Sequence, residues 1–249
     1  MTDSHARTGW REAIGLALGL GAAPLLAAAS LVRHARVLHP RGATFVCRVD
    51  AAEKVPSSFR GLANRLEGTA LARFSGAMWK ADVERFEVLG VALRITRAES
   101  PCEVPLTDDQ DLLFATIVSP LTMPFSPFTT DAHSFFRNHY WAVAPFEVDG
   151  VRAKFRLRAT SPSVCSVGRY DELRAAVRTG RASFSLEVRR TLHFGWAPLA
   201  EIRVDHEAAL DDDALRFSAF RTGRGIVPRG VVQAMRRPAY AASQWPRPR

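Results

Sequence analysis

The stretch Val151-Arg-Ala-Lys-Phe-Arg-Leu-Arg-Ala-Thr160 alternates apolar residues with arginine, lysine or threonine. Because successive side chains of a strand point to opposite faces, this alternation predicts a β-strand with one buried face. Asp149-Gly150 precedes the stretch, and residues 140–148 before it are again strand-like. Asp-Gly between two such runs is typical of a two-residue hairpin turn. The sequence therefore predicts a β-hairpin over residues 140–160.

Six further segments have strand features and are separated by turn residues. They cover residues 43–49, 69–75, 88–95, 112–118, 182–189 and 200–204. With the hairpin they make about eight strands, which is enough to close an antiparallel β-barrel.

Helical patterns interrupt or follow the strands at residues 58–66, 130–138, 170–178 and 230–240. We therefore expect a mainly β fold with helices (α+β): an eight-stranded antiparallel barrel with an N-terminal helical arm and a C-terminal helix. The sequence contains no internal repeat and no low-complexity linker. We expect the arm at residues 1–35 and a single barrel domain at residues 36–249.

Ala13–Val32 is an uncharged run of about the length that spans a bilayer. Alanine, glycine and leucine dominate it, and arginines flank it on both sides. Three interpretations stay open: a small-residue helix that is docked or peripheral, a membrane anchor, and the core of a signal peptide. We favour the docked or peripheral helix, because alanine and glycine contribute little to insertion.

The 249 residues carry a formal net charge of +9, almost entirely from arginine. Guanidinium groups bind carboxylates and phosphates bidentately, so this composition suits anionic ligands or acidic membranes. The arginines are scattered rather than grouped with aromatic residues, which argues against nucleic-acid binding.

The three cysteines, Cys47, Cys102 and Cys165, are widely spaced and form no Cys-x-x-Cys pair. They therefore indicate neither a zinc site nor a disulfide framework. Unpaired thiols fit a reducing compartment, so we expect a cytoplasmic protein. Any association with a membrane is expected through the peripheral contact of Ala13–Val32.

Two stretches near opposite ends of the chain contain residues suited to redox chemistry. His39 lies between Arg36 and Arg41, where a histidine can exchange a proton near neutral pH beside fixed positive charge. Tyr240 follows Arg236 by one helical turn, so the two side chains share a helix face. There the guanidinium can stabilise the tyrosine phenolate, the form that ligates ferric haem iron. Each motif taken alone also fits an ordinary surface pair.

Five landmarks along the chain resemble, in order, those of the haem catalases. They are Arg36-Val-Leu-His39-x-Arg41-Gly42, Ala72-Arg73-Phe74-Ser75, Gly90-Val-Ala-Leu-Arg-Ile95, Asp111-Leu-Leu and Arg236-x-x-x-Tyr240. The resemblance covers residues 36–247. It implies a catalase-like barrel whose C-terminal helix carries the haem ligand, haem b as the cofactor, and an enzyme that consumes hydrogen peroxide or organic hydroperoxides.

The resemblance also implies a role for each matching position. His39 would be the distal histidine that moves a proton between the peroxide oxygens, and Ser75 would hydrogen-bond it. Tyr240 would be the axial ligand of the haem iron, and Arg236 would stabilise its phenolate. The other positions implied to contact haem are Arg36, Arg73 and Arg247 at the propionates and Phe135 near the ring.

Departures from the family pattern bear on the activity. Catalases follow the Asp-Leu landmark with an asparagine that donates a second distal hydrogen bond, whereas this chain has Phe114-Ala115-Thr116. Thr116 is the candidate substitute, because alanine has no donor. Leu38 is bulkier than the usual valine beside the distal histidine. The chain is also about half the usual catalase length, which argues against the family's intertwined tetramer and leaves a homodimer open.

Three functions fit these features. The first is a catalase-like peroxidase that uses a peroxide and an unidentified electron donor. The second is hydroperoxide rearrangement of the allene oxide synthase type. The third is a barrel that binds haem or another apolar ligand without catalysis. Retention of His39, Ser75 and Tyr240 favours the first, and the absent asparagine favours the third.

Overall fold

A computed structural model describes residues 41–79, 84–142, 145–163, 168–212 and 214–230 of the chain. The barrel belongs to one compact unit, Leu38–Val227. The expected arm at residues 1–35 lies outside the described residues, as does the expected C-terminal helix after residue 230. The expected boundary between arm and barrel domain therefore stays a prediction.

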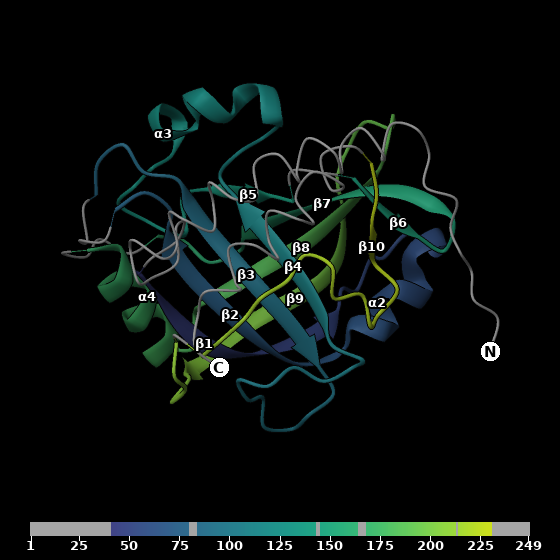
Figure 1. The fold of residues 1–249 in the computed structure, drawn as a ribbon, viewed down its shortest axis with the longest axis horizontal. Helices are drawn as coiled ribbons and strands as arrows, with labels where there is room; N and C mark the ends of the chain where they lie inside the picture. The colour runs from purple at the N-terminus through teal and green to yellow at the C-terminus, as the bar shows by residue number, and fades with distance from the viewer. Residues whose placement is uncertain (1–40, 80–83, 143–144, 164–167, 213, 231–249) are drawn as a thin grey trace, which may run out of the picture. The chain divides into compact units, whose positions relative to one another are not determined.

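The described residues form ten strands, eight of which make up a closed barrel. The strands are β1 (Arg41–Ala51), β2 (Gly68–Gly76), β3 (Leu89–Thr96), β4 (Gln110–Ala115), β5 (His139–Trp141), β6 (Phe146–Val148), β7 (Val151–Ala159), β8 (Ser183–Arg190), β9 (Ala197–Glu207) and β10 (Val227–Pro228). Eight of them follow the order β7-β5-β4-β3-β2-β1-β9-β8, and the antiparallel pairing of β7 with β8 closes the ring (Figure 1). This confirms the predicted eight-stranded antiparallel barrel.

The hairpin between β6 and β7 follows from its turn sequence. Asp149 and Gly150 have φ of 48° and 79°, and Val148 pairs with Val151 across them. Positive φ at both central residues matches the right-handed twist of the flanking strands, and aspartate and glycine tolerate it. Along β7 the alternate residues that fill the barrel are Ala153, Phe155 and Leu157, all buried.

Aromatic side chains fill much of the barrel interior. The Phe74 ring of β2 lies 5.9 Å from the Phe45 ring, 5.4 Å from the Phe135 ring and 5.4 Å from the Phe184 ring, centroid to centroid. Edge-to-face and tilted pairs at these separations add to the stabilisation from burial. The interior is therefore filled by the protein's own side chains, as expected for a barrel of eight strands.

Short helices lie between the strands of the described part of the chain. They are the α-helices α2 (Arg60–Leu66), α3 (Ser126–Thr129) and α4 (Arg169–Arg178) and the 3-10 helices η1 (Ser57–Phe59) and η2 (Pro120–Phe125). The helices predicted at residues 58–66 and 170–178 are thus confirmed as η1–α2 and α4. No helix among the described residues is long and apolar enough to cross a membrane.

The helix predicted at residues 130–138 is wrong, because this segment forms turns. The Asn138 side chain donates to the carbonyl oxygens of Asp131 and Ser134 at 2.8 and 2.7 Å, and accepts from the Asp131 N–H at 3.0 Å. These bonds replace the backbone bonds of a helix. Helical residues occur earlier, where Ser119 and Thr122 form a capping box at the start of η2.

Replacing Glu207 by glutamine should destabilise the protein near neutral pH but not in acid. Arg174 of α4 donates to the two Glu207 oxygens of β9 at 2.9 and 3.0 Å, and this hydrogen bonding lowers the pKa of Glu207 below its usual 4.5. A lowered pKa in the folded state stabilises the fold above the unfolded-state pKa, and the stabilisation is lost as the pH falls through the folded value. Because both side chains are substantially exposed, we expect a loss of about 0.2–1 kcal/mol at neutral pH.

Urea unfolding at neutral pH and at a series of lower pH values measures this dependence, since the stabilisation is lost as the pH falls through the folded-state pKa of Glu207. Glu201→Gln, on the exposed side of the same strand, is the control and should have no such effect at any of these pH values. An equal loss for Glu207→Gln at all pH values would contradict the assigned role of the ion pair.

Candidate functional site on the outer face of the barrel

Two rows of directly paired residues cross the outer face of β1–β4. Paired residues in antiparallel strands point to the same face, opposite to their sequence neighbours. Since Phe45 and Phe74 point into the barrel, the neighbouring rows point outward. The first row is Gly42, Ser75, Gly90 and Ala115, and the second is Thr44, Arg73, Ala92 and Leu113.

Four members of these rows have no side chain beyond Cβ and form what we call the small-residue platform: Gly42, Gly90, Ala92 and Ala115. Ala92, Ala115 and the adjoining Leu113 are half-buried. The small side chains of Ala92 and Ala115 leave the backbone close to the surface, whereas Gly90 is buried and the Arg73 guanidinium lies over Gly42. The platform is therefore a candidate surface for a planar ligand.

Ser75 lies on β2 between the two glycines of the first row. Its side chain is 4% exposed, and its hydroxyl donates to the Gly90 carbonyl oxygen at 3.5 Å. The distance is at the long end for a hydrogen bond. The hydroxyl is therefore held on the platform side of the sheet.

Arg73 lies two residues from Ser75 on the same face and is 3% exposed. Its Nε donates to both Asp212 oxygens at 2.8 and 3.0 Å, and its Nη2 donates to Oδ2 at 2.8 Å. Thr44 donates to the same carboxylate at 2.8 Å. Arg73 thus already binds a carboxylate in the forked geometry that a haem propionate would require.

Gly42 makes room for this arginine. A Cβ at Gly42 would lie 2.6 Å from the Arg73 Cζ and 2.7 Å from the Phe74 carbonyl oxygen. Such contacts are far inside van der Waals distance, and the second involves rigid backbone. Only glycine at position 42 therefore allows the guanidinium to lie flat across β1.

Thr116, the candidate second donor, is directed away from the platform. Its hydroxyl accepts from the Leu89 N–H at 3.1 Å and from the Thr130 hydroxyl at 2.7 Å, and the side chain is 5% exposed. The platform position beside it is occupied by Ala115. The described part of the chain therefore places a methyl group, and not a hydrogen-bond donor, at that point of the first row.

Phe135 is not brought together with Arg73 and Ser75. It is fully buried, and its ring lies 5.4 Å from the inward-pointing Phe74 and 5.2 Å from Tyr170. Its carbonyl oxygen accepts a hydrogen bond from Tyr140 at 2.8 Å. Phe135 thus lies on the interior side of β2.

The remaining residues implied by the resemblance lie outside the described residues: Arg36, His39, Arg236, Tyr240 and Arg247. Their placement relative to the platform stays a prediction. Within the described ranges, no group of three or more histidine, cysteine, aspartate or glutamate side chains could hold a metal ion.

A buried charge cluster lies on the outer face of β3 and β4, and the sequence predicted no role for it. Arg94 of β3 and Asp111 of β4 are 1% and 0% exposed, and Arg94 Nε lies 3.2 Å from Asp111 Oδ1. Asp111 also accepts from Arg221 and, at 2.7 Å, from the Ser218 N–H. The cluster fixes the segment after β9 across the outer face. In the sequence, Arg94 and Asp111 could have been noticed as charged residues within mainly apolar strand segments.

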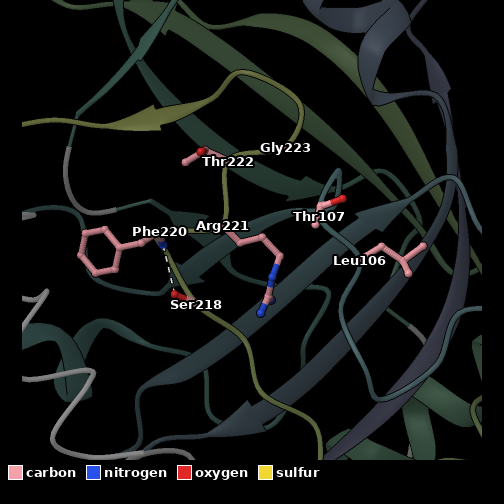
Figure 2. A pocket seen from close by; sticks show the side chains of 7 residues that line it. All are labelled: Leu106, Thr107, Ser218, Phe220, Arg221, Thr222 and Gly223. Carbon is pink, nitrogen blue, oxygen red and sulfur yellow. Dashed lines mark hydrogen bonds between the residues drawn. The ribbon is translucent and has the colours of Figure 1, made fainter. Parts of the chain in front are cut away.

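The segment after β9 also borders a cavity of about 440 Å³ (Figure 2). The residues that line it are Leu106, Thr107, Ser218, Phe220, Arg221, Thr222 and Gly223. Arg221 is the charged residue of this lining, and its guanidinium is already bound to Asp111. None of the four predicted site residues that the structure describes lines the cavity. It is therefore distinct from the small-residue platform.

The closed barrel with a small-residue outer face has the catalase-like fold. Among solved structures, a bacterial catalase superposes with a TM-score of 0.62 at 12% identity over 84% of this chain and 57% of that chain. A fungal catalase superposes with a TM-score of 0.59 at 9% identity over 85% and 59%. The chain thus spans less than two thirds of the length of either structure. No family model and no curated protein sequence matches it.

Proposed function

We propose that this protein binds haem b against the small-residue platform and reduces peroxides. The observation that carries the proposal is the juxtaposition of that platform with Ser75 and Arg73 on a catalase-like barrel. The platform fits a planar ring, and Arg73 fits a carboxylate, as its binding of Asp212 demonstrates. A propionate would share or replace Asp212 at this guanidinium.

In this proposal Tyr240 ligates the iron, Arg236 stabilises its phenolate, and Arg36 and Arg247 assist at the propionates. When bound, haem would supply redox chemistry toward peroxide. His39 would take a proton from one peroxide oxygen and return it to the other. Ser75 would hold the imidazole in the required tautomer by a hydrogen bond. Phe135 would support this face from within the barrel.

The orientation of the Thr116 hydroxyl bears on whether the site favours dismutation of hydrogen peroxide or its reduction by an external electron donor. Dismutation requires the site to hold and orient a second hydrogen peroxide, for which a preorganised donor is valuable. Ala115 offers none on the platform, and the Thr116 hydroxyl is bound to Leu89 and Thr130. We therefore propose turnover by an external electron donor in preference to dismutation.

An absorption spectrum tests the haem site. The full chain, expressed with added haem precursor, should show the Soret band of a high-spin ferric tyrosinate protein. Tyr240→Phe should remove or shift this band, because phenylalanine has no oxygen ligand. Tyr170→Phe, which removes a hydroxyl beside Phe135 but away from the proposed ligand, is the control and should leave the band unchanged. A folded wild-type protein without haem would refute the proposal.

Introducing an asparagine tests the distal side. Ala115→Asn should raise oxygen release from hydrogen peroxide by roughly tenfold or more, because one preorganised donor in an active site commonly contributes at least that factor. Ala159→Asn, at a half-buried position on β7, is the control and should have no effect. Reductant-dependent peroxide consumption, measured in parallel, should persist in both variants.

Two other functions are favoured by the same missing donor. A hydroperoxide rearrangement needs no second peroxide, and it would consume lipid hydroperoxide without any added reductant. A binding protein would take up haem or another apolar ligand, and His39→Ala would leave its behaviour toward peroxide unchanged. Peroxide assays of the wild type and His39→Ala, with and without reductant, separate the three functions.

A further inference from the structure

The loop between β8 and β9 exposes two large apolar side chains at its tip. Leu192 is 95% exposed and Phe194 is 100% exposed. Scattered surface apolar residues are ordinary, but two side chains exposed almost completely within three residues are a local apolar patch. The loop is therefore a candidate interaction surface.

The base of this loop is fixed to the barrel. Thr191 N–H donates to the Arg152 carbonyl oxygen at 2.9 Å, and His193 N–H donates to the Arg190 carbonyl oxygen at 3.1 Å. Leu192 has a φ of 73°, a conformation that a bulky residue seldom adopts without a compensating role. These hydrogen bonds order the backbone at the start of the loop, and Leu192 and Phe194 are exposed to solvent beyond it.

Four basic residues flank the loop at the adjoining ends of β7 and β8, and we call them the basic collar: Arg152, Lys154, Arg189 and Arg190. They belong to β7 and β8, where Lys154 pairs with Arg189 and Ala153 with Arg190. Further along the same strands, Arg156 and Arg158 bind Glu187, which balances part of their charge. An acidic residue, Glu147, lies opposite Arg152. The collar therefore has a net positive charge directly behind the apolar tip.

Trp196 follows Phe194 by two residues and packs against Arg189 of the collar. The guanidinium carbons of Arg156 and Arg189 each lie 4.7 Å from the centre of its ring. Tryptophan is enriched where a protein meets the boundary between lipid and water, because its ring is apolar and its N–H is polar. The loop thus joins two exposed apolar side chains to a tryptophan that is packed against arginines.

The other exposed apolar surface has a different electrostatic setting. Leu121, Phe125 and Phe128 on η2 and α3 are 88, 66 and 71% exposed. Nearby, His133 and Glu84 form a pair with 2.8 Å between Nδ1 and Oε2, so the charges there are mixed. This second surface is also apolar but has mixed charges beside it, and it provides a comparison for the loop.

We propose that the β8–β9 loop docks the protein on an anionic lipid bilayer. Leu192 and Phe194 enter the boundary between headgroups and acyl chains, and the basic collar binds lipid phosphates. Charge complementarity identifies the occupant, since four cations behind an apolar tip match an anionic interface. The proposal is independent of haem binding and of the predicted peripheral contact through residues 13–32.

Vesicle flotation tests the proposal with the full chain. The wild type should bind phosphatidylcholine vesicles containing phosphatidylglycerol, and more weakly vesicles of phosphatidylcholine alone. Leu192→Ser with Phe194→Ser should weaken binding to the anionic vesicles by roughly tenfold or more, as the loss of two inserted apolar side chains requires. Arg189→Gln with Arg190→Gln should weaken it by roughly tenfold and reduce its salt dependence.

Leu121→Ser with Phe125→Ser on η2 is the matched control, and this variant should bind as the wild type does. Two results would overturn the proposal: no binding of the wild type to anionic vesicles, or equal binding by the wild type and the loop variant. Sedimentation of each variant without lipid provides a further check. If the loop substitutions change the molecular mass and not vesicle binding, the tip is a contact between copies of this chain and the lipid proposal is wrong.

Discussion

Asp111→Asn is expected to lower the free energy of unfolding by about 3–5 kcal/mol, because it leaves buried guanidinium groups without their counter-charge. Arg94 Nε lies 3.2 Å from Asp111 Oδ1, and neither side chain has more than 1% of its surface exposed. Asparagine keeps the shape of the residue but removes the charge that Arg94 and Arg221 share. Urea unfolding should therefore give a lower midpoint with an unchanged slope.

Arg94 and Asp111 both lose their hydration on burial, so removing one charge of the pair should cost much more than replacing both residues with apolar ones. Arg94→Met combined with Asp111→Leu should accordingly be less destabilising than Asp111→Asn alone. Asp108→Asn is the control, because Asp108 is 43% exposed and 3.9 Å from Arg97. Similar losses in the free energy of unfolding for Asp108→Asn and Asp111→Asn would show that the buried cluster stabilises the fold no more than an exposed ion pair does.

Ala92→Phe is expected to weaken haem binding while leaving the barrel folded. Ala92 lies in the second row of the platform between Arg73 and Leu113, and its side chain is half-buried on the outer face. A phenyl ring there would occupy the volume in which we place the haem, and such overfilling commonly costs about 1–3 kcal/mol, or about five- to 150-fold in affinity. The Soret absorbance per chain after loading measures the loss.

Lys154→Phe adds the same ring to the outer face of β7, away from the platform, and should leave haem uptake unchanged. Circular dichroism of both variants establishes that the barrel is intact. If Ala92→Phe takes up haem as the wild type does, the ligand lies elsewhere and the small-residue platform has only a structural role. This result would leave the spectrum of Tyr240→Phe as the separate test of the axial ligand.

The strands were predictable because their determinants are local. The alternation in residues 151–160 and the Asp149-Gly150 turn specify β7 and its hairpin without reference to the rest of the chain. The helix predicted at residues 130–138 does not form, because a side chain competes for its backbone hydrogen bonds. Its backbone is satisfied by the Asn138 side chain, and the helical pattern of the sequence does not reveal that competition.

The face on which each candidate residue lies depends on the register across several strands. In sequence, Ala115 and Thr116 are adjacent, and either could occupy the platform. The pairing of Ala115 with Gly90 places the methyl group outward and directs Thr116 toward Leu89. A shift of one residue would exchange the two, because strand side chains alternate with a period of two.

The sequence alone therefore determined the barrel, its hairpin turn and the choice of Ser75 and Arg73 as candidate site residues two positions apart on one strand. Tertiary structure decided what surrounds them: Asp212, 139 residues from Arg73, binds its guanidinium, and Phe135 lies inside the barrel. The physical reason is the range of the interactions. Alternation and turn conformation are fixed within a few residues, whereas the partner of a buried charge depends on which distant segment the closed barrel brings across it.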